Sequence, residues 1–157
     1  MRHKTTVGEV DGGVLAYTAG QDLVLDRELI EADCLGTAAH VQMLSRVPVR
    51  PSLLTKADAR RVVEELRNIV ADAEAGRFTI TLQDQDVHLA VERRLTERLG
   101  DLGKRVHVCR SRNDQVAVDL RLYAKTRLLE AASSAVDLIR TLLAVGRKQE
   151  KVPMVGR

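Results

Sequence analysis

The sequence predicts an all-α protein, and three observations point to this class. The 157 residues contain one Phe, two Tyr and no Trp, so Leu, Val, Ile and Ala must form the core. Apolar residues recur at three- and four-residue steps in several long stretches, which is the spacing of one face of an α-helix. Proline and glycine separate these stretches and are typical of helix ends. The content of 45% hydrophobic and 30% charged residues fits a folded globular chain.

The first part of the chain holds a glycine-rich arm and one predicted helix. Residues 1–20 show no clear period, so we expect a loosely ordered arm with one short extended piece. From residue 22 to about 44 the pattern predicts a helix, followed by a turn at Pro48 and Pro51. We expect His40 to be partly buried on this helix. Its predicted packing face consists of Leu25, Leu29, Ala32, Gly36, Ala39 and Met43.

A second helix is predicted to follow Thr55. Thr55 with Asp58 three residues later is a variant of the capping box, which satisfies free backbone N–H groups at a helix start. Gly76 is expected to end the helix. One apolar stripe, which indicates a structural element, runs through Ala59, Val62, Val63, Leu66, Ile69, Val70 and Ala73.

A third helix is predicted within residues 82–99. Asp84 or Asp86 is placed to cap its start. Val87, Val91 and Leu95 repeat at four-residue steps and form its expected buried face. His88 and Glu92 lie one turn apart, at a spacing that permits an ion pair.

A dense polar loop at residues 107–115 then opens the longest predicted helix. Asn113 is a candidate N-cap, and Asp114 falls in the first turn, where a negative charge suits the helix dipole. A helix start flanked by Arg110 and Arg112 is a natural seat for a carboxylate or phosphate. A capped helix with a solvated basic loop is the alternative interpretation.

The helix predicted from residue 114 to about 151 has apolar residues on more than one face. Its length would be roughly 55 Å at about 1.5 Å per residue, which is too long for one compact domain of this size. A helix with so wide an apolar perimeter needs neighbours on several sides.

Three segments of the sequence resemble the argininosuccinate lyase family of the fumarase/aspartase superfamily. RSRNDQVAVDLRL, from Arg110 on, is similar to the family's first signature region. QDVHLAVERRL, from Gln85 on, is similar to its Glu-Asp-Ile-His and Glu-Arg-Arg-Leu block. LVLDRELIEADCLGTAAHVQML, from Leu23 on, resembles its first helix. The resemblance covers about residues 17–157.

The resemblance implies the fold, the assembly and the reaction. It implies an N-terminal, mostly helical domain at residues 1–112, and the start of the central long-helix bundle at residues 113–157. Family members are homotetramers in which signature regions of three subunits form each active site. They split argininosuccinate into arginine and fumarate by β-elimination, with no cofactor or metal. The substrate-binding residues implied here are Asn113, Arg112, Ser111, His88 and Asp22.

The sequence departs from the family pattern at several positions. Val108-Cys109 replaces a usual Thr-Gly, and Gln85 replaces an acidic residue. Asp22 stands where many members have a substrate-contacting Ser, and its carboxylate suits a guanidinium instead. The closing EKVPMVGR resembles the approach to the second signature region, so the family's catalytic His and Ser regions are not within these residues. We therefore expect the N-terminal portion of such an enzyme, inactive by itself.

Composition weighs against several other classes. The net charge of +3 and the scarcity of aromatic residues do not favour a nucleic-acid groove. No apolar run approaches a membrane span, and no signal-peptide pattern is visible. Cys34 and Cys109 lack metal-ligand spacing, which favours a reduced, cytoplasmic setting.

Three rival functions remain open. One is a non-catalytic, crystallin-like structural homologue, and another is a lyase of the same superfamily acting on fumarate or adenylosuccinate. The third is a helical RNA-binding or assembly module that would use Arg110, Arg112, Arg121 and Arg127.

Overall fold

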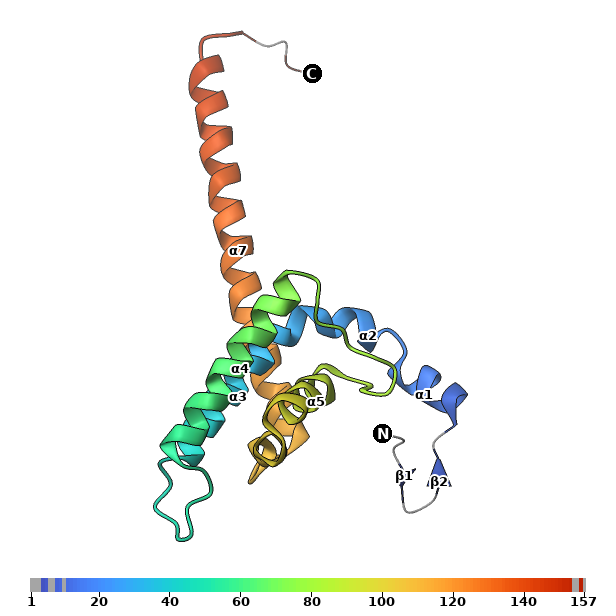
Figure 1. The fold of residues 1–157 in the computed structure, drawn as a ribbon. Coiled ribbons are helices and arrows are strands. Elements are labelled where there is room, and N and C mark those ends of the chain that lie inside the picture. The colour runs from blue at the N-terminus through green and yellow to red at the C-terminus, as the bar shows by residue number, and fades with distance from the viewer. Residues whose placement is uncertain (1–3, 6–7, 10, 154–155, 157) are drawn as a thin grey trace. The chain divides into compact units, whose positions relative to one another are not determined.

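The computed structural model describes residues 4–5, 8–9, 11–153 and 156, and it confirms the all-α class (Figure 1). The chain divides into two units, residues 1–121 and residues 122–157. The helices are α1 (Gly12–Ala19), α2 (Asp22–Leu25), α3 (Ile30–Leu44), α4 (Lys56–Glu74), α5 (Val87–Leu99), α6 (Asp101–Lys104) and α7 (Arg112–Gln149), with 3₁₀ turns η1 (Asp26–Leu29) and η2 (Arg105–His107). In the described ranges, strands are limited to β1 (Lys4–Thr5) and β2 (Gly8–Glu9), an antiparallel pair with Lys4 opposite Glu9.

The arm predicted for residues 1–20 contains a helix, α1, that the sequence pattern did not indicate. Asp11 caps α1, and its side chain accepts hydrogen bonds from the backbone N–H groups of Gly13 at 2.8 Å and Val14 at 3.2 Å. This cap satisfies donors that the first turn leaves free, which offsets the poor helix propensity of two glycines. Residues 1–3, 6–7 and 10 of the predicted arm lie outside the described residues.

The helix predicted for residues 22–44 is present as α2, η1 and α3, but its predicted packing face is only partly confirmed. Ala32 is buried and Leu29 and Gly36 are half-buried. Leu25, Ala39 and Met43 are exposed. The buried face of α3 instead consists of Ile30, Ala32, Asp33, Cys34, Thr37, Val41 and Leu44. The error arises because this face includes a carboxylate and a hydroxyl, so an apolar period cannot locate it. His40 is half-buried, as predicted.

The predictions for α4 and α5 are confirmed. Thr55 and Asp58 form a complete capping box at the start of α4, and Asp86 caps α5 by accepting from the Leu89 N–H at 2.7 Å. Figure 1 shows α4 lying along α3. The core of the first unit includes Val41, Leu44, Leu54, Val62, Leu66, Ile69, Phe78, Val87, Val91 and Leu95. Each buried side chain of this size contributes about 1.5–3 kcal/mol of stabilisation through its burial.

Short α6 packs directly against the backbone of α5. A Cβ atom added at Gly103 would lie 2.5 Å from the Leu95 carbonyl carbon and 2.5 Å from the Thr96 nitrogen. Only glycine fits such a close approach. The turn through α6 and η2 then leads into the polar loop before α7.

The long helix predicted from residue 114 is confirmed as α7, whose 38 residues span roughly 57 Å at about 1.5 Å per residue. Its first turns belong to the first unit and bury Gln115 and Asp119. In the second unit, every described side chain from Ala124 onward is exposed. The predicted boundary between residues 112 and 113 remains a prediction. No helix in the described part of the chain is long and apolar enough to cross a membrane.

Candidate functional site

The start of α7 is capped by Ser111, not by Asn113 as predicted. The Ser111 hydroxyl accepts a hydrogen bond from the Asn113 N–H at 3.2 Å, and the Asp114 carboxylate accepts one from the Ser111 N–H at 3.0 Å. The prediction failed because Ser and Asn are both good caps, and the helix begins earlier than expected. The exposed Asn113 side chain makes no hydrogen bond to any described residue.

Arg112 joins the start of α7 to the start of α5. Its guanidinium lies 3.1 Å from the Asp86 carboxylate, and this is the same carboxylate oxygen that caps α5. Asp26 from η1 accepts a hydrogen bond from the Val87 N–H at 3.0 Å. Burial is the main cause that raises the pKa of Asp26, and the negative charge of Asp22 adds to it. The starts of η1, α5 and α7 are therefore linked through the charged side chains of Asp26, Asp86 and Arg112.

The predicted site residues are only partly brought together. Ser111, Arg112 and Asn113 lie on one turn, with exposed or half-buried side chains. Asp22 lies in the first turn of α2 and forms no hydrogen bond or ion pair with these three described residues. His88 is 5% exposed and faces the interior, not the loop surface. Their substrate-binding roles remain predictions.

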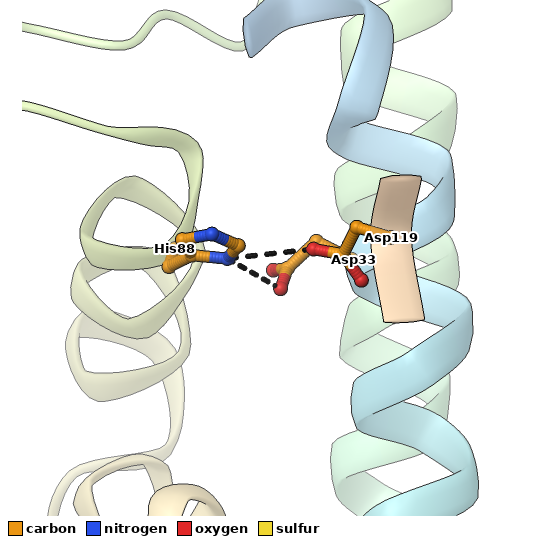
Figure 2. A group of neighbouring side chains, drawn as sticks. All are labelled: Asp33, His88 and Asp119. Carbon is orange, nitrogen blue, oxygen red and sulfur yellow. Dashed lines mark hydrogen bonds and ion pairs between the residues drawn. The ribbon is translucent and has the colours of Figure 1, made fainter. Parts of the chain in front are cut away.

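His88 belongs to a buried polar cluster with Asp33 and Asp119, shown in Figure 2. Its Nδ1 lies 2.9 Å from Asp33 Oδ1 and 3.5 Å from Asp119 Oδ2. The amide nitrogen of Gln115 donates to the same Asp33 oxygen at 2.8 Å. His88 thus pairs with Asp33 on α3 and not with Glu92 on its own helix. We call Asp33, His88, Gln115 and Asp119 the buried cluster.

Arg110 provides the positive charge nearest to the buried cluster. Its guanidinium donates to the Thr37 hydroxyl at 3.2 Å, and the charges of Asp33 and Asp119 stabilise it. Burial nevertheless lowers the pKa of Arg110 below its ordinary value. An arginine stays charged in proteins, so it offsets part of the negative charge in the cluster.

Asp119 has the most strongly perturbed carboxyl of the site. Burial and, after it, the negative charge of Asp33 raise its pKa to about 7, against the opposing influence of His88 and Arg110. A buried carboxylate beside another carboxylate is costly to ionise, because both desolvation and like charge disfavour the charged form.

Asp33, His88 and Asp119 also have the spacing of metal ligands. Their three ligand atoms lie within 4.8 Å of one another, and among the described residues no other group of His, Cys, Asp and Glu meets this condition. Imidazole and carboxylate suit several divalent cations. The charge of nearby Arg110 opposes a second cation here.

Sequence reasoning missed Asp119, Gln115 and Asp33 as members of a site. Gln115 and Asp119 are four residues apart and therefore share one face of α7. This spacing alone does not identify a site, because α7 carries many other polar residues that face solvent. Nothing in the local sequence indicated that Asp33 faces His88, which is 55 positions away.

The chain belongs to a lyase family. A family model described as "Lyase" matches residues 6–157. The match covers all the helices that carry the buried cluster and the whole of α7. The helical fold and the polar turn before a long helix agree with this membership.

Among its relatives are enzymes named argininosuccinate lyase. The chain is 40% identical over 148 residues to that of Bacteroides fragilis, which covers 94% of this chain and 32% of the relative. The chain is 42% identical over 149 residues to the Sorangium cellulosum enzyme, which covers 95% of this chain and 34% of the relative. The identity to the Phocaeicola vulgatus enzyme is 41% over 140 residues, which covers 89% of this chain and 30% of the relative. The chain thus spans about a third of the length of these relatives, consistent with an N-terminal portion.

Proposed function

We propose that this chain forms the N-terminal part of an argininosuccinate lyase, which cleaves argininosuccinate to arginine and fumarate in arginine biosynthesis in the cytoplasm. The main support is the polar turn Ser111, Arg112 and Asn113 at the start of α7, together with relatives of that name about 40% identical to the chain. The chemistry is β-elimination, in which a base takes a proton beside a carboxylate while an acid assists the leaving guanidinium nitrogen.

The proposed role of this chain is to bind the substrate. Negative charge develops on the carboxylate as the proton leaves, and fixed donors aimed at that charge lower the barrier. Backbone N–H groups at a helix start, the amide of Asn113 and the guanidinium of Arg112 are donors of this kind. Arg112 is already held by Asp86 at 3.1 Å, so its position is fixed before substrate arrives.

We also propose that α7 joins a helical bundle in a homotetramer. Its exposed apolar side chains include Leu128, Leu129, Leu138, Ile139, Leu142 and Leu143, each more than half exposed. Apolar surface on this scale is typical of an interface with other helices. The remaining substrate contacts, the general base and the general acid would come from outside these residues.

The test is a chimaera in which this chain replaces the corresponding segment of the Bacteroides fragilis relative. We expect the chimaera to release fumarate from argininosuccinate, followed by ultraviolet absorbance. Asn113→Ala should lower kcat/KM by about 100-fold or more, since one lost donor to developing charge has effects of this size.

The matched control is Asn68→Ala, which removes an exposed Asn on α4 that bonds to Glu65 at 3.1 Å. It should leave kcat/KM unchanged. The 157-residue chain alone should release no fumarate. An inactive but folded tetrameric chimaera, or equal activity in the Asn113→Ala and Asn68→Ala variants, would contradict the proposal.

A further inference from the structure

The two carboxylates of the buried cluster are unequally satisfied. Asp33 Oδ1 accepts from both His88 and Gln115. Within the described ranges, neither oxygen of Asp119 receives a hydrogen bond, although the side chain is 1% exposed. An ionised carboxylate without donors is among the most costly groups to bury. Asp33 Oδ2 likewise has no donor among the described residues.

Asp119 also lies where α7 approaches α3 closely. A Cβ atom added at Gly36 would lie 3.4 Å from Asp119 Oδ1 and 3.3 Å from Val118 Cγ1. Gln115 lies one turn before Asp119 on the same face of α7, and its side-chain amide donates to Asp33, which, like Gly36, lies on α3. Bonds from these two residues to α3 would fix both the rotation and the depth of the opening turns of α7.

Charge balance favours a proton over a metal ion in this cluster. The titratable groups that interact with it are Asp33 and Cys34 on α3, His88 on α5, Asp26 on η1 and Arg110 in the loop. Arg112 and Glu92 in turn act on Arg110. One proton on Asp119 leaves a single carboxylate charge in the cluster facing Arg110. A divalent cation would neutralise both carboxylates and leave the charge of Arg110 uncompensated in the interior.

We propose that the carboxyl of Asp119 is protonated in the folded chain and donates to Asp33, and that Asp119 is thereby a positioning residue for the turn Ser111–Asn113. The positioning role in catalysis rests on the proposed function, whereas the proton and its effect on the turn do not. The proton supplies the donor that Asp33 Oδ2 lacks, so both undersatisfied carboxyls are paired by one bond. Burial raises the pKa of Asp119 to about 7, which agrees with a proton held at mildly acidic pH.

The proton can be detected directly by infrared spectroscopy on the 157-residue chain. At pH 6, the difference spectrum between the chain and its Asp119→Asn variant should show the C=O stretch of one protonated carboxyl. This band should vanish as the pH rises past about 7. Asp137→Asn, at an exposed position on α7, is the matched control and should remove no such band. Absence of the band at pH 6 in the folded wild-type chain would overturn the proposal.

The stability of the wild-type chain and the Asp119→Asn variant should diverge with pH in a defined direction. Between about pH 4 and pH 7 the folded wild-type chain holds a proton that the unfolded chain has released, so the free energy of unfolding falls as pH rises. Asp119→Asn is a neutral mimic that cannot ionise, and it should lack this loss. A constant stability difference between the two proteins across this window would contradict the proposal.

The effect on the turn can be followed by NMR without any enzymatic activity. In the wild-type chain, the amide resonances of residues 111–113 and the side-chain amide of Gln115 should shift with a midpoint near pH 7. In Asp119→Asn the midpoint near 7 should disappear, and in Asp119→Leu the resonances should differ from wild type at every pH. Identical titrations in wild type and Asp119→Asn would refute the positioning role. Zn²⁺-dependent stabilisation that Asp119→Asn abolishes would also overturn the proposal, by showing a metal site.

Discussion

The two units of the chain depart from the usual distribution of polar and apolar side chains in opposite ways. Residues 1–121 bury Asp33, His88 and Asp119, whereas residues 122–149 expose a series of leucines. Buried charge persists only where paired groups hold it, and a large exposed apolar face persists where another surface covers it. In the first unit the exceptional residues are paired with one another within the chain. In the second they are exposed, and they form the surface that the proposed helical bundle would cover.

The largest effect should come from removing the shared acceptor of the buried cluster. Asp33→Ala leaves His88 and Gln115 without their common partner, and we expect it to lower the free energy of unfolding by about 4 kcal/mol. Urea denaturation at pH 7 measures this change. Asp101→Ala, at a fully exposed ion pair with Lys104, is the control and should leave the free energy of unfolding essentially unchanged. A loss below about 1 kcal/mol for Asp33→Ala would show that the cluster adds little stability.

A pair of leucines tests whether the apolar residues of the two units differ as their burial indicates. Leu66 on α4 is 2% exposed, and Leu142 on α7 is 60% exposed. Leu66→Ala should cost about 3 kcal/mol in the 157-residue chain, because it removes buried surface and leaves a cavity. Leu142→Ala should cost less than about 0.5 kcal/mol. Urea denaturation of both variants measures the two losses.

Equal losses for the two leucine variants would mean that α7 is already covered in the isolated chain, for example by self-association. Sedimentation at several protein concentrations would then distinguish association from folding. In a chimaera that forms the complete bundle, Leu142→Asp should instead weaken the tetramer.

The smallest expected effect concerns Cys109, just before the polar turn. Its φ is +61°, a left-handed conformation that residues with a Cβ adopt at a cost, and the family resemblance places Gly at this position. Cys109→Gly should therefore raise the free energy of unfolding by about 0.5–1 kcal/mol, after the greater flexibility of unfolded glycine is allowed for. Cys109→Ala keeps the Cβ and serves as the control. A higher unfolding temperature for Cys109→Ala than for Cys109→Gly would refute this explanation of the loop conformation.

The regular helices were predictable from the sequence because their signals are local. The capping box at Thr55 and the stripe from Ala59 to Ala73 lie within a few residues of each other and of the element they define. The period-based prediction failed at α3, where Asp33 and Thr37 occupy the buried face. It also failed at α1, where the cap at Asp11 outweighs two glycines.

The candidate site was predictable only in part. The motif identified the turn with Ser111, Arg112 and Asn113, but not which residue caps α7. The buried cluster depends on α3, α5 and α7 packing together, and no local pattern encodes that packing. A carboxylate such as Asp119 has the sequence signature of a solvent-facing residue until its neighbours are known.

The backbone contact at Gly103 has a consequence for the turn that precedes the candidate site. Side chains can rotate away from a new neighbour, but the main-chain atoms of Leu95 and Thr96, which would lie 2.5 Å from a methyl group added at residue 103, cannot. Even alanine at this position would push α6 off α5 and carry the following segment with it. The absence of a side chain at residue 103 therefore sets where the chain leaves α5 and, with it, where the polar loop before α7 begins.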